Sequence, residues 1–111
     1  MQYRNVAQGT RCEILKDAVR ESQLKAESWE DHVGRLKDKI GFESRQLESL
    51  RQQADRRGDY ESFAPAIKDK ETDIRNFERQ VGVARRNAKE WRQHIDDLED
   101  EMAQNGCFGS V

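Results

Sequence analysis

The chain has 111 residues, of which 38 % are charged and 34 % are hydrophobic, and its formal net charge is −2. This length suits one small domain, and a mean hydropathy of −1.11 excludes a thick globular core. Disorder of the whole chain is disfavoured, because disordered segments combine low hydrophobicity with high net charge, whereas these charges nearly cancel.

Residues 1–10 are predicted to form a flexible N-terminal segment. The opening stretch "MQYRNVAQGTRCEIL" lacks the apolar core of a signal peptide. No apolar run in the sequence approaches the roughly 18 residues of a membrane span. We therefore expect a cytoplasmic protein without a membrane partner.

A first helix is predicted over residues 11–57. Alternating steps of four and three residues from Leu15 reach an apolar residue everywhere except at Ser22 and Glu43. The positions are Leu15, Val19, Ser22, Ala26, Trp29, Val33, Leu36, Ile40, Glu43, Leu47, Leu50 and Ala54. Such a seam, sustained over several heptads, is typical of a coiled coil and not of a strand, which would alternate with period two.

A turn is predicted at residues 58–62. Gly58 suits the left-handed position after a helix C terminus, where the missing Cβ removes the steric penalty. Ser62 is the expected N-cap of the following helix. This assignment places Pro65 in the first helical turn, where its missing N–H is no loss.

A second helix is predicted over residues 63–104, with a seam in which Lys70 is the one charged residue. The positions are Phe63, Ile67, Lys70, Ile74, Phe77, Val81, Ala84, Ala88, Trp91, Ile95, Leu98 and Met102. The Asn-Gly pair that follows is a helix stop signal. Residues 105–111 are accordingly predicted to be a flexible tail.

The predicted fold class is all-α, a long antiparallel two-helix coiled-coil hairpin, because a short loop favours antiparallel neighbours. In the register that we predict, Trp29 lies opposite Ala88 and Trp91 opposite Ala26, so that large residues face small ones across a narrow core. Further layers pair Leu15 with Met102, Ser22 with Ile95, Leu36 with Val81, Ile40 with Phe77, and Leu47 with Lys70. The core is thin, so a homodimer that forms a four-helix assembly is compatible with the sequence.

Charged residues support this register. The expected pairs on the flanks are Lys16 with Glu99, Glu30 with Arg85, and Lys37 with Glu78. Within the seams, Glu43 and Lys70 lie in neighbouring layers and are expected to reach each other. A polar pair in a seam fixes the register at some cost in stability.

No residue pattern indicates an enzyme. His32 and His94 occupy layers of the hairpin that are far apart, and the carboxylates are scattered over convex helical surface. General acid–base chemistry needs a concave and desolvated site. No phosphate-binding glycine loop, nucleophile elbow or metal motif occurs in the sequence. We therefore expect a non-enzymatic protein without catalytic residues, cofactor or metal.

Several outward-facing features make candidate partner-binding residues. Three glycines share one outer heptad position, although glycine inside a helix costs about 1 kcal/mol relative to alanine. Apolar residues also lie off the seams at Ile14, Leu24, Phe42 and Val83, and the second helix carries a basic stripe. The candidates are Gly34, Gly41, Phe42, Gly82, Val83, Arg79, Arg86 and Lys89. The glycines indicate either a packing surface or a bend, and the stripe either a binding surface or a solvated face.

Cys12 and Cys107 are a possible disulfide. The register places Cys12 beside Asn105 at the open end of the hairpin, and a flexible segment with Cys107 could fold back onto the first helix. A disulfide needs Cα atoms within roughly 7 Å, which this arrangement permits without requiring it. In a reducing cytoplasm such a bond would not usually persist.

Two functions stay open. The first is a helical-hairpin interaction protein that binds a protein partner as a scaffold, chaperone or inhibitor, for example a small phage-type inhibitor of a host complex. The alternative is a nucleic-acid- or RNA-polymerase-directed regulatory factor that acts through the basic stripe or an acidic tip. The stretch "GDYE" puts Asp59 and Glu61 at the tip. This is similar to Gre-type transcript cleavage factors, which also use an antiparallel coiled coil with an acidic tip. Nucleic acid is the less favoured partner, because no aromatic residues interleave with the arginines.

Overall fold

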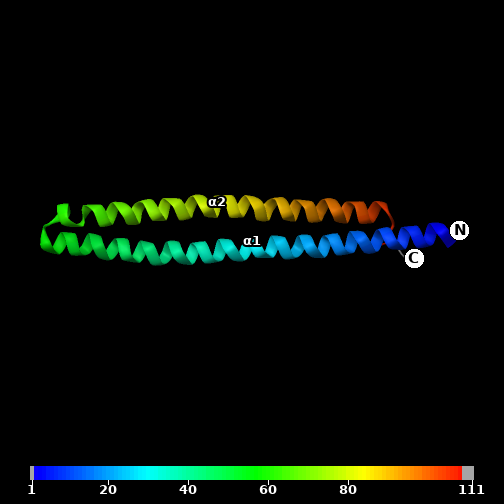
Figure 1. The fold of residues 1–111 in the computed structure, drawn as a ribbon, viewed down its shortest axis with the longest axis horizontal. Helices are drawn as coiled ribbons and strands as arrows, with labels where there is room; N and C mark the ends of the chain where they lie inside the picture. The colour runs from blue at the N-terminus through cyan, green and yellow to red at the C-terminus, as the bar shows by residue number, and fades with distance from the viewer. Residues whose placement is uncertain (1, 109–111) are drawn as a thin grey trace. The chain divides into compact units, whose positions relative to one another are not determined.

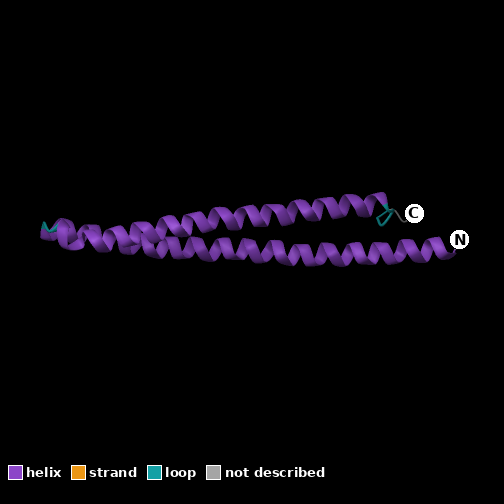
Figure 2. Ribbon diagram, turned by 45° about the horizontal axis from the view of Figure 1, so that its top comes forward, coloured by secondary structure: helices purple, strands orange, loops and turns teal. Residues whose placement is uncertain are grey.

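The chain consists of two long α-helices, as Figures 1 and 2 show in a computed structural model that describes residues 2–108. Helix α1 spans Gln2–Arg57 and helix α2 spans Tyr60–Gln104, and side chains are described from residue 9 onward. The predicted all-α antiparallel hairpin is confirmed. The chain divides into two compact units: unit 1 comprises Met1–Glu30 and Arg86–Val111, and unit 2 comprises Asp31–Arg85. Each unit is therefore an antiparallel pair of helical segments.

The predicted seams form the core of both units. Every residue that is buried in the described part of the chain belongs to one of the two seams. These residues are Leu15, Ser22, Ala26, Leu36, Leu47 and Ala54 on α1, and Val81, Ala84, Ala88, Ile95 and Met102 on α2. The hydroxyl of the polar member, Ser22, donates to the carbonyl oxygen of Ala18 at 2.7 Å, so its burial leaves no unsatisfied donor.

Three contacts between the helices confirm the register. In unit 1, Lys25 Nζ lies 4.6 Å from the ring centroid of Trp91, and Lys25 directly precedes the predicted partner of Trp91. In unit 2, Lys39 Nζ lies 5.8 Å from the ring centroid of Phe77 and precedes the predicted partner of that ring in the same way. Lys70 donates to Gln46 Oε1, one residue before its predicted partner Leu47. The same offset in all three contacts fixes one register for both units.

Both helices end in the same backbone motif. Gly58 has a φ of 65°, and its N–H donates to the carbonyl of Asp55 while the next N–H, of Asp59, donates to Ala54. At the end of α2, Gly106 has a φ of 72°, and Cys107 N–H donates to the carbonyl of Met102 at 2.9 Å. These are Schellman motifs, which need a residue in the left-handed conformation and so favour glycine.

The start of α2 differs from the prediction. Asp59, and not Ser62, is the N-cap, because Ser62 N–H donates to Asp59 Oδ1 at 3.3 Å and Ser62 Oγ donates to Asp59 Oδ2 at 2.6 Å. The helix therefore begins at Tyr60 instead of residue 63, and Pro65 lies inside it, where proline removes one helical hydrogen bond. The aspartate directly after Gly58 takes this role instead of the serine, because its two carboxylate oxygens accept from both the N–H and the hydroxyl of Ser62.

The other segment bounds also differ. Helix α1 begins at Gln2, where a flexible segment over residues 1–10 was predicted. Residues 105–108 form the turn that follows α2, and the remainder of the predicted flexible tail lies outside the described residues. The heptad pattern predicted too late a start for α1, because it follows buried residues and a helix can continue beyond the last residue that it buries.

The ion pair within the seams is as predicted, but the flank pairs are not. Lys70 Nζ lies 2.7 Å from Glu43 Oε2, and both side chains are largely buried. Glu30 pairs with Arg92 at 2.7 Å instead of with Arg85, one heptad away. Arg51 and Glu71, at 3.8 Å, follow the same shifted pattern.

The shift has a geometric cause. Helical side chains lean toward the N terminus of their own helix. In an antiparallel pair, a side chain of α1 therefore leans toward α2 residues of higher number, and a side chain of α2 leans toward α1 residues of higher number. This direction brings Glu30 to Arg92. For the part of the chain that the structure describes, no ion pair joins Lys16 to Glu99 or Lys37 to Glu78.

The register predicts the outcome of a packing substitution. Ala26 is fully buried in the layer of Trp91, so Ala26→Trp overpacks that layer and is expected to lower the free energy of unfolding by about 1–3 kcal/mol. The second change Trp91→Ala should restore part of this loss. Thermal melting monitored by circular dichroism measures both, with the exposed Ala66→Trp as control. A double variant no more stable than Ala26→Trp alone would contradict the register.

The pair Glu43–Lys70 gives a second prediction. Either Glu43→Leu or Lys70→Leu leaves a half-buried charge without its partner and is expected to cost about 1–3 kcal/mol. The double variant removes both charges and should regain most of that stability, because apolar residues often replace a buried ion pair without loss. Chemical denaturation measures the free energy of unfolding of all four proteins. Strictly additive losses would show that the two side chains do not interact.

Candidate protein-interaction surface

The candidate glycines lie together on one side of unit 2. Helical periodicity places Gly34 and Gly41 of α1 beside the seam on the same side as Arg51, and Gly82 of α2 beside the seam on the same side as Glu71. Arg51 and Glu71 form an ion pair across the helices, so these two sides meet. We call this surface of unit 2 the glycine flank.

Nothing inside the chain explains these glycines. A Cβ added to Gly34 or Gly82 would meet no heavy atom within 4 Å, and at Gly41 it would make an ordinary contact of 3.5 Å with Arg45 Nη1. None of the three has a positive φ, in contrast to Gly58 and Gly106. Alanine would fit at each site and would favour the helix. The glycine flank is therefore an open strip of backbone.

Two arginines of α2 lie beside this strip. Arg79 and Arg85 are exposed and lie on the same side of α2 as Gly82. Among the residues that the structure describes, neither arginine has a carboxylate within 4.0 Å, whereas Arg75 donates to Thr72 Oγ1 at 3.2 Å. Unpaired guanidinium groups are ready donors for a carboxylate or phosphate. The glycine flank thus combines open backbone with unpaired positive charge.

The other candidates lie on the opposite side of unit 2 or belong to unit 1. Phe42 and Val83, which are 53 % and 47 % exposed, lie on the opposite side of the seams of unit 2. There Phe42 lines a shallow groove together with Lys39 and Phe77. The basic candidates Arg86 and Lys89 are exposed residues of unit 1.

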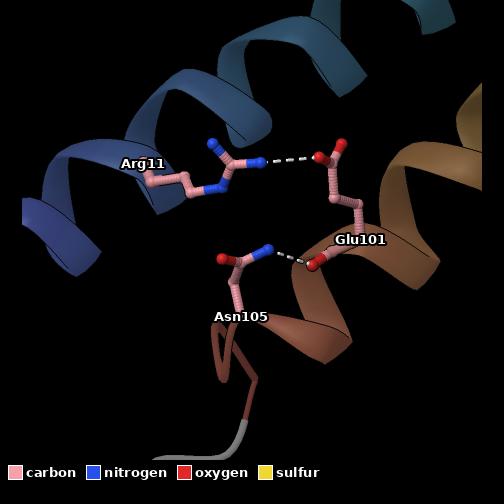
Figure 3. Close-up of polar contacts among 3 residues, drawn as sticks. All are labelled: Arg11, Glu101 and Asn105. Carbon is pink, nitrogen blue, oxygen red and sulfur yellow. Dashed lines mark hydrogen bonds and ion pairs between the residues drawn. The ribbon is translucent and has the colours of Figure 1, made fainter.

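The end of unit 1 at which α2 stops carries a second group of residues. Cys12 and Cys107 form a disulfide with Cα atoms 5.6 Å apart. Arg11 Nη2 lies 2.8 Å from Glu101 Oε1, and Asn105 Nδ2 donates to the carbonyl of Glu101 at 2.7 Å (Figure 3). The sequence indicated the disulfide as possible, but it did not single out Glu101 as the partner of Arg11. The side chains of α1, α2 and the following turn are thereby tied together.

Phe108 extends this end of unit 1. It lines a groove with Val19 and Met102 of the seams, and Lys16 and Glu99 also line that groove. The ring is 59 % exposed, so it covers the groove only in part. On a second groove Ile14, 63 % exposed, lies beside Arg11 and Glu101. The sequence predicted Phe108 only as part of a tail. Nothing in the local sequence indicates which part of the helix pair a residue after the helix stop will contact.

Among the side chains that the structure describes, three groups have shifted pKa values, and each shift comes mainly from hydrogen bonding to the charged form. The hydrogen bonds from Arg92 hold the pKa of Glu30 below its ordinary value, and those to Glu30 raise the pKa of Arg92. The hydrogen bonds from Ser62 lower the pKa of Asp59. All three are exposed and lie in ion-pair or capping geometry, so the shifts indicate structural roles.

Other candidate sites find no support in the described part of the chain. His94 packs edge-on against Trp91 at 5.7 Å between ring centroids. No group of three or more His, Cys, Asp or Glu side chains within residues 9–108 is placed to hold a metal ion. No helix that the structure describes is long and apolar enough to cross a membrane.

Comparison with known proteins gives no relative. No protein-family model, no curated protein and no solved structure matches this chain. Its function therefore has to be argued from its own residues.

The N-cap makes the stability of α2 pH-dependent. The folded-state pKa of Asp59 is below its ordinary value of 3.8, so its contribution is complete above that value and is lost as the pH falls through the folded-state pKa. We expect the first turn of α2 to fray in this acidic range. Hydrogen exchange of residues 60–64 between pH 5 and pH 2 measures the loss. Asp59→Asn is the matched control, because asparagine also caps but does not titrate. If Asp59→Asn shows the same pH profile, the cap is not the cause.

Proposed function

We propose that this chain is a non-enzymatic helical-hairpin protein that binds a protein partner through the glycine flank of unit 2. The observation that carries the proposal is the presence of Gly34 and Gly82 within long helices, where no contact or backbone conformation of this chain calls for glycine. Each costs up to about 1 kcal/mol of helix stability. Close approach of another backbone would offset this cost.

The chemistry of the flank indicates the kind of partner. Glycine positions allow a second helix to approach closely, and the unpaired Arg79 and Arg85 favour a partner with acidic side chains. A partner helix with small residues at its centre and carboxylates at its sides fits both features. Binding of this kind serves a scaffold, chaperone or inhibitor equally. A second copy of this chain is one form that such a partner could take.

The alternative, a factor directed at nucleic acid or RNA polymerase, draws on the same arginines. Sequence-independent binding to DNA would depend steeply on salt, because each neutralised phosphate releases counterions. The acidic tip supports this alternative weakly, since Asp59 is engaged as the N-cap of α2. Titration of the protein into random-sequence DNA at two salt concentrations separates the two proposals.

Substitution of the three glycines tests the proposal. In the variant Gly34→Ala, Gly41→Ala, Gly82→Ala the new methyl groups fit the monomer, so its stability should rise by up to about 1 kcal/mol per site. Association should weaken, because the methyl groups hold the two backbones apart. Sedimentation measures self-association, and quantitative mass spectrometry after affinity capture from the lysate of the native host measures other partners.

Two matched controls sharpen this experiment. Gly9→Ala makes the same change in unit 1 and should raise helix propensity without loss of a partner. Arg79→Glu should weaken capture, whereas Arg35→Glu makes the same charge change on the opposite side of unit 2 and should not. A captured protein whose recovery is unaffected by the glycine and Arg79 variants would count against the glycine flank as the binding surface.

A further inference from the structure

The most informative feature outside the glycine flank is the path of the chain after α2. The Schellman motif at Gly106 reverses the chain, and Cys107 N–H donates to the carbonyl of Met102. This reversal directs Cys107 toward α1, where its sulfur bonds to that of Cys12. Residue 108 follows at once, and its ring lies at the groove of Val19 and Met102. The position of Phe108 therefore depends on a covalent bond one residue away.

The rest of unit 1 does not need this bond. The seam residues Leu15 and Met102 are buried, and Arg11 is paired with Glu101. The side chain of Asn105 braces the last turn of α2 through the carbonyl of Glu101 (Figure 3). These interactions join residues that precede Gly106. Opening of the disulfide removes the covalent tie of residues 107–108 to α1 and leaves the helix pair in place.

We propose that the Cys12–Cys107 disulfide is a redox-controlled latch that holds Phe108 against Val19 and Met102 as one wall of their groove. Neither cysteine is fully buried, so the bond lies near the surface, where a reductant can approach it. In the oxidised protein the ring of Phe108 forms one wall of the groove and covers part of it. In the reduced protein the ring is released, and the apolar side chains that it partly covers, Val19 and Met102, become more exposed to solvent.

The co-reactant is a dithiol, and the exchange balances. A thiolate of the dithiol attacks one sulfur of the Cys12–Cys107 bond, and the other sulfur leaves as a thiolate that takes up a proton. The second thiol of the reductant, as its thiolate, then attacks the mixed disulfide and releases the remaining cysteine, which is also protonated. In sum the protein gains two electrons and two protons, and the dithiol becomes a disulfide.

Hydrogen exchange of the full chain tests the latch. In the oxidised protein the amides of Gly106 and Cys107 should exchange slowly, and reduction by dithiothreitol should accelerate both several-fold while the helices keep their protection. Cys107→Ser should show the fast rates at residue 106 under both conditions. The oxidised Phe108→Ala variant keeps the disulfide and should bind the apolar dye anilinonaphthalene sulfonate as the reduced wild type does, several-fold more than the oxidised wild type.

Two results would overturn the proposal. The first is equal exchange at residues 106–107 in the oxidised and reduced proteins, which would show that the backbone motif alone holds the segment. The second is a bond that stays closed at equilibrium with an excess of a thioredoxin-type dithiol, which would make it a permanent crosslink. Circular dichroism of each variant monitors the helices, so loss of the fold is not mistaken for release of the latch.

Discussion

The antiparallel register of the two seams is the constraint on which the rest of the structure depends. In each unit the core consists of a single row of layers between the two helices. A slip by one layer would therefore expose much of the apolar surface that the helices bury against each other. Large residues face small ones, as Trp91 faces Ala26, and a slipped register would bring large residues together. The half-buried pair of Glu43 and Lys70 adds an electrostatic penalty for the same slip, because each charge would lose its partner.

This register also decides what the outer surfaces can do. It brings the glycines and unpaired arginines of unit 2 to one side and leaves Phe42 and Val83 on the other, so the two sides of the unit differ in chemistry. At the end of unit 1 it brings Cys12 to the level at which α2 ends. Neither arrangement could be obtained from one helix alone, since each combines residues that are distant in the sequence.

The sequence was sufficient to predict the seams, and with them the fold class and the register, because burial against a single partner helix imposes a strict period. It was not sufficient at the helix ends, where hydrogen bonds of single side chains compete. Asp59 and Ser62 are both good caps, and the choice depends on which oxygen the chain geometry presents to the free N–H groups. The flank ion pairs were predicted wrongly for a related reason. The heptad pattern gives only the level of a residue along the helix, whereas the direction in which its side chain leans selects Arg92 over Arg85 as the partner of Glu30.

A glycine that lowers helix stability without a reason inside the chain indicates a contact outside it. At Gly58 and Gly106 the positive φ explains the residue, and the cost of glycine is offset within the chain by a completed helix end. At Gly34 and Gly82 no such gain exists within the chain, because a methyl group would meet only open space. In a sequence that folds well, the conformational preference of each residue agrees with the fold. Residues that disagree with it are expected mainly at functional sites. An unpaired Arg79 beside the same open backbone is a second exception at the same place, and a contact with an acidic helix would account for both.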